Sequence, residues 1–289
     1  MRLTLLEAHL LCFVIVAIDV LARGVRLRWY LKGLGTDTSL GHAVTATAWG
    51  DAAAGLTPLR FGGEAAKFAG LMRARVRPAT ALLGLGLEAA VTYPLVAAFG
   101  FGLAGLYAPT WWSAARPLIG EALLTGWPWV LGILVLTVVG GWLVLQWRRR
   151  RVRTSGESGP SARAALRQVP RWVILVGIPL SLYNILGRTL VLPLLACTLP
   201  VHPPFGVMML GSFALLYSQL LLPMPAGIGA VDFGFLAGVA GDLGPERTGL
   251  LLAWRLYTVG LGALLGAALA LHSLGWTAIR RVVVRPPTR

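Results

Sequence analysis

Charged residues are scarce in this sequence. Asp, Glu, Lys and Arg make up 13% of the 289 residues, whereas soluble domains carry roughly 25%. Hydrophobic residues make up 56%, which excludes a disordered chain and argues against a water-soluble globule. The composition is instead typical of a membrane protein.

Residues with catalytic or metal-binding chemistry are also few. The two cysteines, Cys12 and Cys197, both lie in apolar runs and indicate no disulfide framework. The four histidines are scattered and form no His-Glu-x-x-His zinc motif. The chain also has no phosphate-loop, dinucleotide-binding or Gly-x-Ser-x-Gly signature. We therefore expect no metal, no cofactor and no enzymatic activity.

Five apolar stretches are long enough to cross a bilayer as helices, which takes roughly 20 residues. They are 3–22, 79–108, 126–147, 172–199 and 248–272. We interpret the first as a retained span and not as a cleaved signal peptide, because its basic residues follow the apolar run instead of preceding it.

Two further apolar stretches, 41–72 and 205–241, are broken near the middle. Each arm of the first has about 16 residues, or ~24 Å of helix, which is too short to cross comfortably. Both stretches are therefore predicted to enter the membrane and return to the same side as re-entrant helical hairpins. The predicted turn residues are Pro58, Gly62 and Gly63 in the first and Pro223, Pro225, Gly227 and Gly229 in the second.

The basic residues set the orientation. The chain has 26 Lys and Arg against 11 Asp and Glu, a formal net charge of +15, and the basic residues cluster between the apolar runs. Nineteen of the 26 fall on the cytoplasmic side if the N-terminus lies outside and the C-terminus inside, as the positive-inside rule requires. We predict a multi-pass protein of the cytoplasmic (inner) membrane with no nucleic-acid partner.

The layout contains an internal symmetry, because span, hairpin, span occurs in 3–108 and again, inverted, in 172–272. The predicted fold is an all-α polytopic membrane protein with an inverted repeat and two re-entrant helical hairpins. Its parts are a first membrane half at 1–147, a basic cytoplasmic linker at 148–171 and a second membrane half at 172–289. The alternative is that Pro and Gly only kink packed helices.

Seven charged residues fall at membrane depth, where each costs roughly 2.5–3.5 kcal/mol and so marks a pathway or a buried pair. These candidate substrate-binding residues are Arg60, Glu64, Lys67, Glu88, Arg188, Asp232 and Arg255. The guanidinium of Arg60 is suited to clamp a lipid phosphate, with Glu64 as its counter-ion or as the partner of a cationic headgroup. Asp232 would form a mirror site with Arg188 or Arg255.

A structural role for these charges is the alternative, since internal ion pairs would lock the two hairpins together. Asp51 and Asn184 are expected to be polar packing partners. Glu7, His9 and Asp19 of the first span are weaker candidates for lining the same cavity.

Two ordered motifs carry a family resemblance. The first is Arg26-Leu27-Arg28-Trp29 followed by Pro58-Leu59-Arg60-Phe61-Gly62-Gly63-Glu64 and Lys67, and the second is Leu222-Pro223-Met224-Pro225-Ala226-Gly227-Ile228-Gly229-Ala230-Val231-Asp232. With Glu88 and Arg255, they resemble the lysylphosphatidylglycerol synthase transmembrane family, which is also called flippase-like and is typified by the N-terminal half of the multiple peptide resistance factor. Ala226 and Asp232 depart from that family's usual Gly and Glu.

The resemblance covers nearly the whole chain and implies the lipid-translocating half of such a system. Because the sequence shows no aminoacyl-transferase domain, we expect no transfer of lysine to lipid. The predicted function is a lipid flippase or transporter that moves an anionic or aminoacylated phospholipid between leaflets. The competing class is a non-transporting scaffold or accessory subunit of a lipid-modifying enzyme, and the sequence leaves open whether the chain forms a homodimer.

Overall fold

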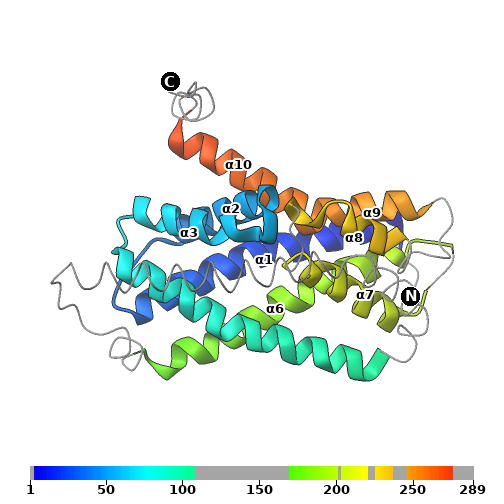
Figure 1. Ribbon diagram of the computed structural model, residues 1–289, viewed down its shortest axis with the longest axis horizontal. Helices are drawn as coiled ribbons and strands as arrows, with labels where there is room; N and C mark the ends of the chain where they lie inside the picture. Colours follow the sequence, from blue (N-terminus) through cyan, green and yellow to red (C-terminus); the bar gives the residue numbers. More distant parts are fainter. Residues whose placement is uncertain (1–2, 108–168, 201–202, 221–224, 237–245, 276–289) are drawn as a thin grey trace, which may run out of the picture.

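The computed structural model of this protein describes residues 3–107, 169–200, 203–220, 225–236 and 246–275. Every regular element in these ranges is helical (Figure 1), which confirms the all-α fold class. The predicted span 126–147, the predicted linker as far as residue 168, and Pro223 lie outside the described residues.

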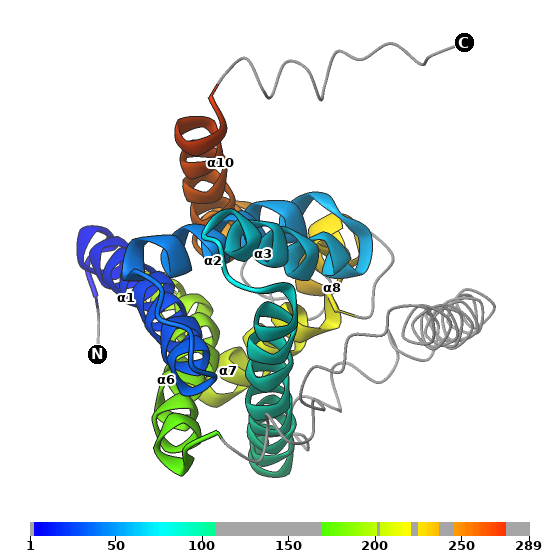
Figure 2. The same cartoon turned by 90° about the vertical axis from the view of Figure 1, so that its left-hand side faces the viewer.

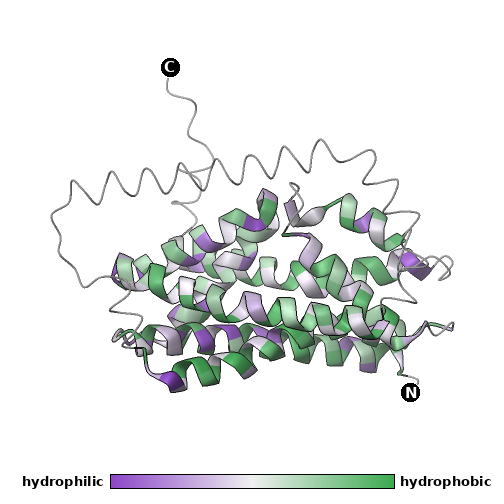
Figure 3. Ribbon diagram, turned by 60° about the horizontal axis from the view of Figure 1, so that its bottom comes forward, coloured by the Kyte–Doolittle hydropathy of each residue, from purple (hydrophilic) through white to green (hydrophobic). Residues whose placement is uncertain are grey.

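Four of the helices are long and apolar enough to cross a membrane. They are α1 (Leu5–Gly33), the helix Pro78–Tyr107, α6 (Arg171–Ala196) and the last helix, Arg247–Ser273, in which α9 (Arg247–Arg255) continues through the π-helical η5 (Leu256–Gly260) into α10 (Leu261–Leu274). Hydrophobic residues run along their length (Figure 3). Only 6% of the apolar window of Pro78–Tyr107 is buried, against 33% to 39% in the other three, so this helix contributes most of its surface to the outside of the described fold.

Helix α1 is longer than the predicted span 3–22. It begins at a capping box, in which the Thr4 side chain accepts a hydrogen bond from the backbone N–H of Glu7, while the Glu7 carboxylate accepts one from the backbone N–H of Thr4. Such a box satisfies two of the backbone donors that every helix start leaves open. The helix then continues to Gly33, because Arg23 and Arg26 are buried partners of other helices and do not end it.

Residues 40–73 form a helical hairpin, with α2 (Leu40–Leu56), the short turn η1 (Pro58–Arg60) and α3 (Phe61–Arg73). Small residues let the two helices approach closely. A Cβ on Gly70 would lie 2.8 Å from the Cα of Ala46, and one on Gly50 would lie 3.0 Å from the carbonyl oxygen of Gly63. Close backbone approach through small residues is the usual basis of helix association in membranes.

Helix α2 is the most enclosed part of this hairpin, since it also packs against α1 and α10 (Figure 2). At about 1.5 Å per residue, its 17 residues span ~25 Å and the 13 of α3 span ~20 Å. Neither reaches the ~30 Å thickness of a hydrocarbon core.

The second interrupted stretch contains α7 (Phe205–Ser218), the turn η2 (Pro225–Gly227) and the five-residue α8 (Ala230–Gly234). In Figure 1, α2 and α3 occupy one half of the length of the molecule, and α7 and α8 occupy the other. The turns η1 and η2 lie against each other where these halves meet. The two sequence breaks are therefore neighbours in space.

Two apolar clusters lie on either side of this meeting point. One joins α1, α6, α7, α8 and α9 around the fully buried Trp254 and Phe235, and includes Cys12 and Val16 of α1. The other joins α1, α2, α3 and the start of Pro78–Tyr107, and includes Leu27 and Leu31 of α1. The stretch of α1 between these clusters carries buried charged residues.

Candidate functional site

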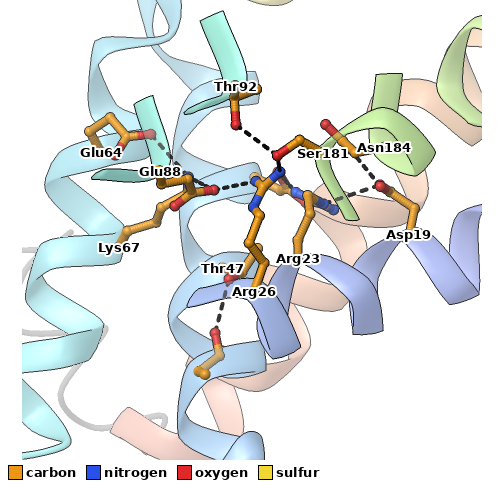
Figure 4. Close-up of polar contacts among 12 residues, drawn as sticks. Asp19, Arg23, Arg26, Thr47, Glu64, Lys67, Glu88, Thr92, Ser181 and Asn184 are labelled. Carbon is orange, nitrogen blue, oxygen red and sulfur yellow. Dashed lines mark hydrogen bonds and ion pairs between the residues drawn. The ribbon is translucent and has the colours of Figure 1, made fainter. Parts of the chain in front are cut away.

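The middle of α1 presents three charged residues on one face. Asp19, Arg23 and Arg26 follow each other at spacings of four and three, which places them on the same side of a helix. All three are buried, with exposed fractions of 0%, 6% and 3%. They bond to polar residues of α2, α6 and the helix Pro78–Tyr107, and Glu88 of that last helix in turn contacts α3 (Figure 4).

The first group of charges joins α1, α2 and α6. Both terminal nitrogens of Arg23 lie 2.7 Å from the carboxylate oxygens of Asp51. Asp19 accepts from the Nε of Arg188 at 3.0 Å and from the side-chain amide of Asn184 at 2.5 Å, and it also pairs with Arg23 at 3.1 Å. Arg188 reaches Asp51 at 3.7 Å. These two arginines and two aspartates therefore form an ion-pair network with no net charge.

The second group centres on Glu88 of the helix Pro78–Tyr107. Its Oε1 lies 2.5 Å from Arg26 of α1 and 3.4 Å from Lys67 of α3. Lys67 also pairs with Glu64, one turn earlier on α3, at 3.0 Å. Arg26 donates to the hydroxyl of Ser181 in α6 at 2.8 Å. This group also has two cations and two acids.

Arg60 differs from the other cations around it. Its Nη1 donates a hydrogen bond of 3.1 Å to the amide oxygen of Gln219, and none of the ion pairs within the described ranges includes it. The expectation that Glu64 is the counter-ion of Arg60 is wrong in this arrangement. Glu64 points to Lys67 instead, because the two lie three residues apart on the same face of α3.

The backbone of the turn fixes where Arg60 points. Leu59 and Arg60 both have left-handed conformations, with φ of 52° and 58°, which cost non-glycine residues roughly 1–2 kcal/mol each. Thr57 holds the turn: its hydroxyl donates to the carbonyl of Ala53 at 2.8 Å and accepts from the N–H of Gly62 at 2.9 Å. A Cβ on Gly62 would lie 2.6 Å from the Thr57 methyl group, so the close turn requires glycine there.

These side chains surround a polar pocket of about 160 Å³. Its lining residues are Arg23, Arg26, Asp51, Arg60, Glu64, Lys67, Leu85, Glu88, Ala89, Thr92, Tyr93, Asn184 and Arg188. Tyr93 is 57% exposed, and the Glu64 side chain is 60% exposed, so the rim of the pocket faces outward while its floor is buried. Five of the seven predicted site residues line it.

Asp232 and Arg255 lie elsewhere. Asp232 accepts from the Nε and Nη2 of Arg255 at 2.8 and 2.6 Å and from the backbone N–H of Gly229 at 2.9 Å. Arg255 also lies over the Trp254 ring, 5.5 Å from its centroid. Asp232 therefore pairs with Arg255 and not with Arg188. The pair connects the turn at Gly227 and Gly229 to α9, whereas the pocket lies on the side of the first hairpin.

A family model described as the lysylphosphatidylglycerol synthase TM region matches residues 2–282. The chain belongs to this family. With four helices of membrane-spanning length and composition, this family member is a multi-pass membrane protein. No curated protein and no solved structure gives a match to it.

Sequence reasoning missed several residues of the pocket in this family member. Arg23 and Arg26 directly follow the first apolar run and count among the 19 basic residues predicted on the cytoplasmic side, yet both are buried. The spacing of Asp19, Arg23 and Arg26 is the available signal, because charges that repeat on one face of an otherwise apolar membrane helix face the interior and pair there. Asp51 and Asn184 were expected to be packing partners, and they do bond to other charges, but both also line the pocket. Nothing in the local sequence singles out Gln219.

Metal binding has no support in the described ranges. No three His, Cys, Asp or Glu side chains come together there to hold a metal ion. The chemistry that the pocket offers is ionic and hydrogen-bonding, with guanidinium donors on its floor and carboxylates already engaged by other cations.

Proposed function

We propose that this protein moves a phospholipid between the leaflets of the cytoplasmic membrane by binding its headgroup in the polar pocket. The cargo class is an anionic or aminoacylated phospholipid, and the process is binding and conformational switching without covalent chemistry. One observation carries the proposal: Arg60 lies at the pocket with a neutral hydrogen-bond partner and no acid among the described residues within ion-pair distance.

An unpaired guanidinium at this position calls for an anion. Charges inside a membrane are costly and usually pair or mark a pathway. A phosphate offers two oxygens in the geometry that a guanidinium recognises. A lipid phosphate would therefore complete the environment of Arg60.

The size of the pocket supports a headgroup as the occupant. Sites for whole drug-sized ligands enclose roughly 300–1,000 Å³, whereas this pocket has about 160 Å³. The acyl chains would then stay outside, along the apolar outer surface of Pro78–Tyr107, where Leu82 is 50% and Phe101 79% exposed.

The layout of the helices supports access from the membrane. Asp19, Glu88 and Asn184 lie near the midpoints of α1, Pro78–Tyr107 and α6, and the hairpin α2–α3 turns at the level of these residues. We propose that this hairpin is re-entrant from the cytoplasm, that the N-terminus lies outside, and that η1 and η2 rearrange to expose the pocket to each leaflet in turn.

A scaffold is the second candidate. It is favoured by the eight charges that pair with each other in two neutral groups, since buried pairs also serve to fix one packing arrangement. A scaffold would hold the same residues together without moving lipid.

Reconstitution distinguishes the two. Purified protein in liposomes is expected to move fluorescently labelled phosphatidylglycerol across the bilayer, measured as the fraction of label that becomes accessible to an impermeant quencher. Arg60→Ala is expected to abolish this movement. Arg77→Ala removes the same charge from an exposed position outside the pocket and is expected to leave it unchanged. Equal rates in Arg60→Ala and the unmodified protein would remove the site assignment, and no movement in the unmodified protein would favour the scaffold.

A further inference from the structure

Gln219, in the second interrupted stretch, bonds to Arg60 of the first interrupted stretch. It follows α7 directly, is 1% exposed, and accepts the hydrogen bond from Arg60 through its Oε1. Its amide nitrogen is buried and has no partner within the described part of the chain. A buried amide nitrogen without a hydrogen-bond partner lowers the stability of the fold. If Gln219 only filled space, an apolar side chain would be more stable at this position.

The charges around the pocket add up to one surplus positive charge. Arg23, Arg188, Asp19 and Asp51 balance, and Arg26, Lys67, Glu64 and Glu88 balance. Arg60 is the remaining cation of the described pocket, and its partner Gln219 is neutral. The other turn provides the contrast, because Arg255 there is paired with Asp232.

We propose that Gln219 sets the charge selectivity of the pocket: it orients Arg60 without neutralising it, so that the pocket takes a headgroup with one net negative charge. This inference rests on the proposed function and specifies the cargo as a lipid whose headgroup carries one phosphodiester charge and no other charge. A zwitterionic headgroup leaves the surplus charge of Arg60 uncompensated, and a dianionic headgroup exceeds it.

The turn itself supports a positioning role for Gln219. The backbone of Arg60 is held at a φ of 58°, and η1 contacts η2, so the Arg60 side chain leaves the turn toward the second half of the protein. Gln219 then fixes the far end of that side chain at 3.1 Å. A carboxylate at the same distance would form a buried ion pair and occupy the site that the lipid phosphate needs.

Two substitutions separate orientation from charge. Gln219→Glu keeps the length of the side chain and neutralises Arg60, whereas Gln219→Leu removes the hydrogen bond and leaves the surplus charge. The readout is the ratio of transport rates for labelled phosphatidylglycerol and labelled phosphatidylethanolamine in phosphatidylcholine vesicles. We expect the unmodified protein to prefer phosphatidylglycerol by about tenfold, the scale of one charge-assisted hydrogen bond.

Gln219→Glu is expected to lower that ratio by about tenfold, and Gln219→Leu to slow both lipids while keeping the ratio. A purely structural role would slow both lipids equally in both variants. If Gln219→Glu does not elute as folded protein in detergent, lipid binding to Arg60→Gln, which lacks the same surplus charge, is measured instead. The ratio of labelled phosphatidylglycerol to labelled phosphatidylethanolamine that copurifies with Arg60→Gln must then be about tenfold lower than with the unmodified protein.

The outcomes also separate this inference from the proposed function. No transport of either lipid by the unmodified protein contradicts the proposed function. Transport of both lipids at equal rates, or an unchanged ratio in Gln219→Glu, overturns the role of Gln219 and leaves lipid transport intact.

Discussion

Arg23 of α1 and Asp51 of α2 face each other with both guanidinium Nη atoms 2.7 Å from the two carboxylate oxygens. The pair is buried, with exposed side-chain fractions of 7% and 11%. Because each charge has lost its water, its stability depends on the other partner. The contact between α1 and the first hairpin therefore depends on this pair.

Replacing Asp51 by Ala is expected to lower the free energy of unfolding by about 3–5 kcal/mol, since it leaves Arg23 and Arg188 short of a buried acid. Chemical denaturation in detergent measures this change. The double variant Arg23→Met/Asp51→Leu leaves Asp19 paired with Arg188 and is expected to be more stable than Asp51→Ala alone. A double variant that is less stable than the single one would contradict this view of the pair.

Thr57 tests the hairpin turn. Thr57→Val keeps the shape of the side chain but removes the hydroxyl that bonds to Gly62 and Ala53. We expect a loss of about 1–3 kcal/mol in unfolding free energy, because the Gly62 N–H loses its partner. Thr57→Ser retains the hydroxyl and is the matched control. Equal stability of the Val and Ser variants would show that the hydroxyl does not hold the turn.

Gly70 tests the close packing of α3 on α2. Gly70→Ala places a methyl group 2.8 Å from the Cα of Ala46, so we expect the thermal stability in detergent to fall by the equivalent of about 1–3 kcal/mol. Gly86→Ala is the same change on another helix, at an exposed site with nothing within 4 Å. There the gain in helix propensity, about 1 kcal/mol, is expected to keep stability or raise it. A Gly70→Ala protein as stable as Gly86→Ala would contradict the close packing.

Cysteine accessibility tests the re-entrant arrangement. Asp37 precedes α2, Arg77 follows α3, and both are exposed. In a background without Cys12 and Cys197, we expect Asp37→Cys and Arg77→Cys to react with an impermeant thiol reagent from the same, cytoplasmic side. Labelling from opposite sides would show that the hairpin crosses the membrane.

The fold class and the family were predictable from the sequence because a bilayer constrains composition so strongly. Apolar runs of sufficient length can only be helices there, and the family match over residues 2–282 confirms the resemblance carried by the two motifs. The Pro and Gly residues of the first turn predicted its break correctly, because close approach at Gly62 excludes a side chain. The inverted repeat stays a prediction, since residues 221–224 and 237–245, in and after the turn of its second hairpin, lie outside the described ranges.

The partners of the charges were less predictable. Arg60 and Gln219 are 159 residues apart in sequence, and their meeting depends on how η1 packs against η2. The predicted surface position of Arg23 and Arg26 is wrong. It follows from the rule that basic residues after an apolar run usually mark a membrane surface. The rotation of α1 turns them inward instead, toward Asp51 and Glu88. Such pairings depend on tertiary packing and not on local pattern.

The packing of α10 on α2 has a consequence for biosynthesis. Gly262 of α10 lies beside Asp51, such that a Cβ there would be 3.0 Å from its carboxylate. The ribosome makes Asp51 more than 200 residues before it makes this neighbour. During translation, the face of α2 that carries Asp51 therefore lacks its neighbour until α10 has been inserted. Until then, the insertion machinery or lipid has to cover that face of the hairpin.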